Sequence, residues 1–586
     1  MAKRDRADGH GMDRRTFVKG GLAAGGLIAG AGAAIWAATG GGGKETPPPA
    51  RLSPQGRRRV RKGAPNVLVI VVDQMRFPQW FGPAANRVGL PPNLALLRQD
   101  AVSFERHYTA ANDCTPSRAA LLTGLYTHQT GCMITGASTL YAGFPTWGTM
   151  LREHGYKTYW YGKWHLTRGD HHWSEARGRP LLESYGFSGG TYPSPDGAPG
   201  QGWRVDPRIT DQFAAWYSDH ADRQPWCTTV SLVNPHDIAW WYERTDRFRA
   251  EASARRVVSR LPPNFETPAQ LIERGKPRLQ LSLQETSARS FGAVPFTGPD
   301  VQAAWLPFLD LYMKLELAAD RHIGRILHAL HSRPEVAANT VIVFTADHGE
   351  YGASHGLRGK GAGAYEEGIR VPLLVKDPRG RLTGAPQQPR TQLTSSVDVA
   401  PLLLTIATGS EDWRRERYYE HLAGRLELSA LLADPDAPGR AHVLHTTDEI
   451  VTEYAIELYA ADAPLHVVAL RTPHAKYAVY GDWTTDGIDL LPAGQESELY
   501  DYSTESGHLE LHNSAGDNPL DRTMNAELLR ALSDELRATL PQRLLAASEA
   551  GIDDYLFTAK AAAAAATARR RRRREAERGA AGRGIL

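Results

Sequence analysis

Cysteine is scarce in this chain: its 586 residues include only Cys114, Cys132 and Cys227. Three cysteines are too few for the disulfide framework of a small secreted protein. Because the number is odd, at least one of them is unpaired or modified. We interpret Cys132 and Cys227 as small core residues, and a bridge between them has no support in the sequence.

The chain also lacks an excess of positive charge. The formal net charge is +3, and six of the positive charges belong to the single tract Arg569–Arg574. A nucleic-acid-binding protein carries a broader basic surface, so no nucleic-acid partner is predicted. The Gly-rich stretch around Lys360 lacks the Gly-Lys-Ser/Thr ending of a P-loop, which excludes that type of nucleotide site. The length allows one large domain and a smaller one.

Residues 1–43 are predicted to be a twin-arginine export signal. Arg14 and Arg15 precede a weakly apolar run rich in glycine and alanine, Gly20–Ala38. A transmembrane anchor is the alternative, although so many glycines make a poor bilayer span. No convincing A-x-A cleavage site follows, so the exported protein is expected to be periplasmic or extracellular, or membrane-anchored by an uncleaved signal. Its export partner would be the twin-arginine machinery.

Two continuous apolar runs, Val67–Val72 and Val341–Phe344, predict strands buried on both faces of a parallel sheet. Each run is followed by a polar pair: Asp73 and Gln74, then Asp347 and His348. Open α/β sheets place their sites at the carboxyl ends of strands. Two carboxylates, an amide oxygen and an imidazole suit calcium or magnesium, and the imidazole also admits manganese. The competing interpretation is that these aspartates only cap turns.

Cys114 is predicted to lie at the N-terminus of a helix. Pro116 suits the first turn, and Gly124 suits the end of the helix. Free backbone N–H groups and the helix dipole favour negative charge there, and Arg118 adds a cation one turn further on. These features predict an anion-binding site around Cys114.

At these residues the chain resembles the sulfatase family, whose members carry Cys-x-Pro-Ser-Arg followed by Leu-Thr-Gly. The resemblance implies that a formylglycine-generating enzyme oxidises Cys114 to formylglycine, whose hydrate is the nucleophile and is held by Arg118. It also implies a metal site, usually filled by calcium, with four ligands: Asp73, Gln74, Asp347 and His348. By residue type alone, Cys114 would be a buried thiol or half of a disulfide.

Two further predicted strands, Tyr156–Tyr161 and Trp226–Val233, also end in polar residues. The first leads into Gly162-Lys163 and completes the second sulfatase motif, Gly-Tyr-x-Thr-x-x-x-Gly-Lys. The resemblance implies sulfate binding by two lysines, proton transfer by His236 to the leaving oxygen, with Lys360 as a second candidate, and proton removal by His165. The catalytic side chains implied in this way are Lys163, His165, His236 and Lys360.

The resemblance implies an α/β fold with a large, mostly parallel sheet sandwiched by helices and a smaller C-terminal antiparallel α+β domain. The expected boundaries are a linker at 44–62, a catalytic domain at 63–408, a C-terminal subdomain at 409–556 and a disordered or helical basic tail at 557–586.

Glu366 and Arg370 are expected to form a structural pair. Trp240-Trp241-Tyr242 is either a platform for a sugar or aryl ring, or part of the core.

The predicted activity is hydrolysis of a sulfate monoester, with a small-molecule or saccharide substrate. A phosphonate or phosphate ester hydrolase of the same superfamily is the closest alternative, because some of its members use formylglycine and a similar metal set. An exported protein that binds metal and sulfate without catalysis is the other alternative, and it requires Cys114 to remain unmodified.

Overall fold

The computed structural model describes residues 58–77, 91–241, 257–448, 466–482 and 490–558, apart from residues 292, 362, 537, 539 and 557. The predicted export signal, most of the predicted linker, Tyr242 and nearly all of the basic tail lie outside these residues. Within the described part of the chain, no helix combines the length and apolar character needed to cross a membrane.

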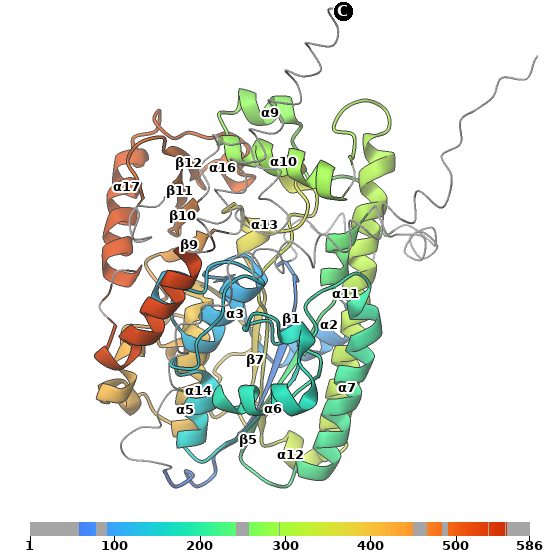
Figure 1. Cartoon of the computed structure of the whole chain (residues 1–586), viewed down its shortest axis with the longest axis vertical. Coiled ribbons are helices and arrows are strands. Elements are labelled where there is room, and N and C mark those ends of the chain that lie inside the picture. Colours follow the sequence, from blue (N-terminus) through green and yellow to red (C-terminus); the bar gives the residue numbers. More distant parts are fainter. Residues whose placement is uncertain are drawn as a thin grey trace, which may run out of the picture.

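A large sheet forms the centre of the molecule, between layers of helices (Figure 1). It has eight strands in the order β4-β3-β5-β1-β6-β7-β2-β8. Neighbouring strands pair in parallel except around β7, which runs antiparallel to both β6 and β2. The strands are β1 Asn66–Val72, β2 Val102–Tyr108, β3 Lys157–Gly162, β4 Ser188–Gly189, β5 Trp226–Leu232, β6 Thr340–Ala346, β7 Leu373–Lys376 and β8 Arg390–Ser395.

Helices cover both faces of this sheet, which explains why β1 is apolar along its whole length. Val67, Val69 and Val71 pack in one core cluster with α5 (Trp147–Glu153) and α14 (Val399–Thr408). The alternate residues Leu68 and Ile70 pack in another with α2 (Pro92–Gln99), α7 (Gln201–His220) and α11 (Val301–His331). Successive strand side chains point to opposite faces, so a central strand between two helical layers needs apolar residues at every position.

A second, four-stranded antiparallel sheet has the order β12-β11-β10-β9. Helix α17 (Leu520–Ala531) packs on one face of it through Met524 and Leu528. The other face packs against Tyr351 and Tyr365, which follow β6 in the chain. The strands are β9 Val443–Thr447, β10 His466–Arg471, β11 Ala475–Gly481 and β12 Glu496–Asp501. The predicted fold class is therefore confirmed.

The remaining elements are short helices and turns around these two sheets. They are α3 Cys114–Thr123, α4 Thr127–Thr130, η1 Asp170–His172, α6 Glu175–Ser184, η2 His236–Trp240, α9 Pro268–Glu273, α10 Arg278–Phe291, α12 Pro334–Ala337, η3 Ser354–Gly356, α13 Glu366–Ile369, η4 Ser396–Asp398, η5 Asp412–Arg415, η6 Arg417–Leu422, α15 Leu428–Ala433, α16 Glu505–His508 and η8 Leu532–Leu536.

Candidate active site

The carboxyl ends of β3, β5, β1 and β6 lie side by side at one edge of the large sheet, because these four strands are consecutive and parallel. Asp73 follows β1, and Asp347 and His348 follow β6. Lys163 follows β3. The topology thus delivers polar side chains from separate segments to one place, as expected for the site of an open α/β sheet.

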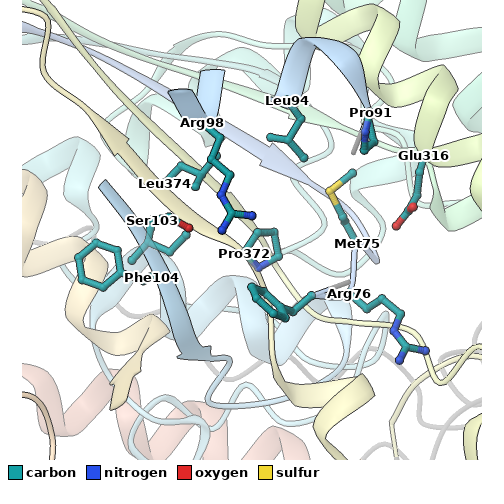
Figure 2. A pocket seen from close by; sticks show the side chains of 12 residues that line it. Met75, Arg76, Pro91, Leu94, Arg98, Ser103, Phe104, Glu316, Pro372 and Leu374 are labelled. Atoms are coloured by element: carbon teal, nitrogen blue, oxygen red, sulfur yellow. The ribbon is translucent and has the colours of Figure 1, made fainter. Parts of the chain in front are cut away.

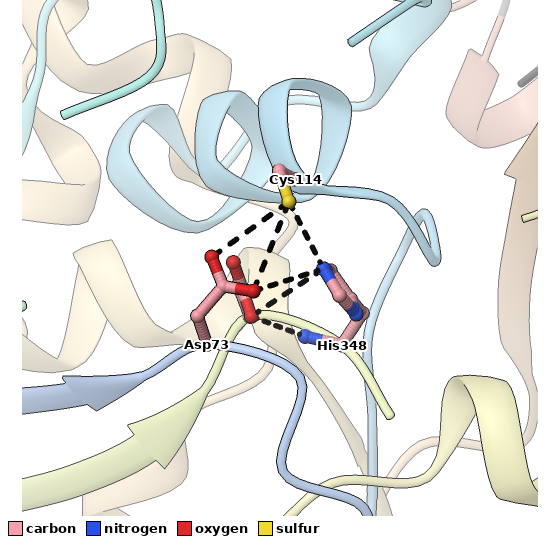
Figure 3. Close-up of side chains that lie close together, drawn as sticks. Asp73, Cys114 and His348 are labelled. Atoms are coloured by element: carbon pink, nitrogen blue, oxygen red, sulfur yellow. Dashed lines mark hydrogen bonds and ion pairs between the residues drawn. The ribbon is translucent and has the colours of Figure 1, made fainter. Parts of the chain in front are cut away.

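Helix α3 brings Cys114 to the same edge. The helix begins at Cys114, as predicted, and the Asp113 carboxylate caps it by accepting the Cys114 N–H at 2.7 Å. It ends at Gly124, whose φ of 70° is left-handed and suits glycine. Cys114 is buried, and its Sγ lies 3.3 Å from His348 Nε2 and 3.7 Å from Asp73 Oδ2 (Figure 3).

Four side chains form a potential metal site. The ligand atoms of Asp73, Cys114, Asp347 and His348 all lie within 4.8 Å of one another. His348 Nδ1 lies 3.0 Å from the Gly349 carbonyl, so a proton there would direct the Nε2 lone pair toward the cluster. The buried Asp347 Oδ2 lies 2.9 Å from the Arg118 guanidinium. Two buried carboxylates and an imidazole that converge in this way fit a cation.

Gln74 completes this donor set. Its backbone has a φ of 65°, and its N–H donates to Asp347 Oδ1 at 3.0 Å. The side-chain Nε2 donates to Glu350 Oε2 at 2.5 Å, which turns Oε1 toward the cluster, 3.0 Å from Lys360 Nζ. The structure therefore brings together all four side chains predicted to bind a metal.

Arg118 contacts both aspartates of the cluster. Its Nη2 is 2.9 Å from Asp73 Oδ2 and 2.9 Å from Asp347 Oδ2. Its Nη1 donates to the Lys163 carbonyl at 2.8 Å and to Ser231 Oγ at 2.9 Å. This fully buried guanidinium consequently fixes the carboxyl ends of four strands, β1, β3, β5 and β6, relative to one another.

Two ammonium groups lie beside the thiol. Lys163 Nζ is 3.4 Å from Cys114 Sγ, and Lys360 Nζ is 3.0 Å from it. Burial raises the pKa of Cys114, but Lys163, Lys360 and His348 outweigh burial and bring that pKa well below its ordinary value. Conversely, burial lowers the pKa of Lys360, and the negative charge on Cys114 and the nearby aspartates raises it overall. The surroundings thus stabilise an anion at position 114.

Both predicted histidines also reach Cys114. Hydrogen bonding with His165 contributes to lowering the pKa of Cys114. Hydrogen bonding with Cys114 acts to raise the pKa of His236. Burial, followed by Lys360 and Lys163, lowers the pKa of His236 to about 4. His236 is therefore neutral at neutral pH in the free protein, and negative charge placed beside it would raise its pKa.

Three supporting residues were not predicted from the sequence. Asp113 caps α3 and lies 3.9 Å from Lys360, and an aspartate directly before a helix start is the capping signal that would have identified it. Glu350 accepts from Gln74 and from the backbone N–H groups of Gly352 and Gly359, at 3.0 and 2.7 Å for the latter two. Ser231 holds Arg118. The last two act between distant segments, which leaves no local sequence signal.

Other predictions have clear structural outcomes. Cys132 and Cys227 are buried and form no disulfide within the described chain, so the interpretation as core residues is confirmed. Glu366 pairs with Arg370 at 3.8 Å, as predicted. Trp241 packs in the core near Phe308, whereas Trp240 is half-buried and donates to the Gly197 carbonyl at 2.7 Å.

Comparisons with known proteins show what this chain is similar to. The sequence model of the sulfatase family matches residues 65–410. Arylsulfatase K of Mus musculus is 25% identical over 522 residues, which are 85% of this chain and 83% of the relative. Choline-sulfatase of Rhizobium meliloti is 27% identical over 466 residues, which are 71% and 78% of the two chains. In fold, the phosphonate monoester hydrolase SpPMH from Silicibacter pomeroyi is similar, with a TM-score of 0.59 and 21% identity over 81% of this chain and 96% of that one.

Proposed function

Because the chain belongs to the sulfatase family and is a sulfuric ester hydrolase, we propose that it cleaves sulfate monoesters at Cys114, converted to formylglycine beside a divalent metal ion. One observation supports this proposal most strongly. Two lysine ammonium groups lie within 3.4 Å of Cys114 Sγ, and the same sulfur atom contacts His348 and Asp73. Such a cluster of cations around a helix N-terminus suits a tetrahedral oxyanion.

Formylglycine would supply an aldehyde hydrate, with one hydroxyl to attack sulfur and a second to release sulfate afterwards. Residues of this chain would hold that group in place. The N-terminus of α3 favours negative charge at position 114, and Arg118 fixes the two neighbouring aspartates through its ion pairs with them.

A divalent cation would supply charge neutralisation and would lower the pKa of a bound hydroxyl. Mainly oxygen donors favour calcium, with magnesium and manganese as alternatives. Glu350 would keep the amide oxygen of Gln74 directed at this site, and the Gly349 carbonyl would keep His348 oriented. The proposed ligands are Asp73, Gln74, Asp347 and His348.

The remaining side chains would bind sulfate and move protons. Lys163 and Lys360 would neutralise the sulfate oxygens, and their burial strengthens that interaction. Sulfate beside His236 would raise the pKa of this imidazole above its value in the free protein, which allows it to protonate the leaving oxygen. Lys360 is the second candidate for the group that donates this proton. His165 would accept the proton that the second hydroxyl at position 114 loses when sulfate is released.

Turnover of two ester classes tests this proposal. The fold likeness to a phosphonate monoester hydrolase supports the alternative that phosphonate is the better substrate. We expect the purified protein to hydrolyse 4-nitrophenyl sulfate with a higher kcat/KM than 4-nitrophenyl phenylphosphonate. A higher kcat/KM for the phosphonate would overturn the assignment to sulfate esters. Export by the twin-arginine route is part of the proposal, and a reporter fused to residues 1–43 would test it separately.

A further inference from the structure

A hollow lies at the edge of the large sheet, between α6 and α7. The edge strand β4 pairs with β3 at only two positions, so most of the outer flank of β3, opposite β5, has no neighbouring strand among the described residues. The hollow has a volume of about 450 Å³, within the range of roughly 300–1,000 Å³ found for ligand pockets. We call it the edge groove, and the residues used below are Tyr159, Tyr161, Arg179, Tyr192, Arg208 and Trp216.

Aromatic rings line the edge groove. Trp216 is buried, and the ring centroid of the partly exposed Tyr159 lies 4.9 Å from it. Tyr192 is also partly exposed and packs over Gly190, where a Cβ would lie 2.2 Å from the tyrosine ring. Rigid rings with polar tips offer an apolar face to a ligand at low entropic cost. The C–H face of a sugar ring packs on such a surface, and its hydroxyls remain free to hydrogen-bond.

The hydroxyl of Tyr161 adds a polar group to the edge groove. The residue is 8% exposed and lines the groove. Gly189 leaves the space beside it open, because a Cβ there would lie 3.1 Å from the Tyr161 oxygen. A hydroxyl of a bound sugar would exchange hydrogen bonds with Tyr161 in place of water.

The charged residues of the groove are not equivalent. Arg179 forms an ion pair with Glu175 on the same helix. Arg208 is exposed, donates from Nη2 to the Tyr192 carbonyl at 2.8 Å, and forms no ion pair within the described chain. Most of the guanidinium fork of Arg208 is therefore available for a sulfate or carboxylate, which it binds in bidentate geometry.

We propose that the edge groove binds an anionic saccharide. One sugar ring packs on Tyr159, its hydroxyls reach Tyr161, and its sulfate or carboxylate group pairs with Arg208. The edge groove shares no residue with the proposed catalytic site, so this binding does not depend on the chemistry at Cys114. A polymeric substrate held there would stay near the enzyme between turnovers.

Calorimetric titration with defined probes tests the edge groove. The probes are a heparin-derived tetrasaccharide, its desulfated form, which keeps the carboxylates, and neutral cellotetraose. We expect Arg208→Gln to weaken binding of the heparin probe about tenfold, since it removes a charge-assisted pair. Arg204→Gln is the matched control, because Arg204 is an exposed arginine one turn earlier on α7 and lies outside the groove. Tyr159→Ala should weaken binding as well, whereas Tyr159→Phe should retain it.

The two arginine variants decide the outcome. Equal affinity of Arg204→Gln and Arg208→Gln for the heparin probe, or equal binding of cellotetraose and the heparin probe, would overturn the proposal. Binding of the desulfated probe as tightly as the heparin probe would identify carboxylate as the group on Arg208, and weaker binding would identify sulfate. Turnover of 4-nitrophenyl sulfate is measured in parallel, and inhibition by the probe reports its binding at the catalytic site. All groove variants should keep wild-type turnover, so a wild-type protein without turnover would count only against the proposed function.

Discussion

One glycine determines where the proposed proton donor lies. Gly197 has a φ of 94°, and a Cβ on it would lie 2.4 Å from Cε1 of His236 and 2.7 Å from its Nε2. No real Cβ approaches a ring so closely, so any side chain at position 197 displaces the imidazole. The Gly197 carbonyl also accepts from Trp240 Nε1 at 2.7 Å, which fixes this segment to η2.

We predict that Gly197→Ala lowers kcat for 4-nitrophenyl sulfate by about 10²-fold, the usual contribution of a general acid. Gly200→Ala is the matched control, because Gly200 also has a positive φ of 67° but no atom lies within 4 Å of a Cβ there. The control bears the same kind of backbone strain without touching His236. Equal kcat values for the two variants would show that the position of His236 does not limit turnover.

Among the secondary-structure elements, those with a signal in their own residues were predicted correctly. The apolar runs predicted β1 and β6, and Pro116 and Gly124 predicted the two ends of α3. Helix α17 begins at Leu520, whose N–H donates to Asn518 Oδ1 just before the helix. The reversed direction of β7 and the role of Glu350 depend on pairing between distant segments, which no local pattern encodes.

Helix α11 carries a buried acid that makes stability depend on pH. Glu316 lines an apolar pocket together with Met75 and Arg76 (Figure 2). Burial raises the pKa of Glu316 to about 8, against the opposing effects of Arg76 and Tyr312. Between the ordinary value near 4.5 and about 8, the folded protein therefore holds a proton that the unfolded chain has lost. The contribution of Glu316 to the free energy of unfolding therefore falls as the pH rises through this window.

We predict that Glu316→Gln removes this pH dependence. Relative to the wild type, the variant should gain on the order of 3–5 kcal/mol in free energy of unfolding between pH 4.5 and pH 9. Urea denaturation of both proteins across that range measures the difference, in which the other titrating groups cancel. A constant difference between the two proteins would show that Glu316 is ionised in the folded state.

At the scale of the whole molecule, a buried ion pair joins the two sheets. Arg471 of β10 donates from Nε to Glu366 Oε1 at 3.0 Å, and both side chains are at least nine-tenths buried. Glu366 belongs to α13 and also accepts from the Tyr108 hydroxyl of β2 at 2.9 Å. Burial raises the pKa of Glu366, but Arg471 and Lys476 outweigh burial and hold it below its ordinary value. The C-terminal sheet thus supplies the charge that keeps this carboxylate ionised.

We predict that Arg471→Met lowers the free energy of unfolding by about 3–5 kcal/mol, because it leaves a buried carboxylate without its nearest cation. Arg415→Met is the control, since Arg415 pairs with Asp412 while its side chain is 87% exposed. An exposed pair contributes little to stability, so the control should unfold at the wild-type urea concentration. Equal midpoints for the two variants would mean that the buried pair contributes nothing to stability.

The most direct test of the central claim is the mass of one peptide. Trypsin releases residues 107–118, which contain Cys114 and no other cysteine. When the protein is produced together with a formylglycine-generating enzyme, we predict a peptide about 18 Da lighter than the unmodified one, and sulfatase activity proportional to the fraction of that peptide. Full activity of the Cys114→Ala variant, or of protein whose peptide keeps its unmodified mass, would contradict the account.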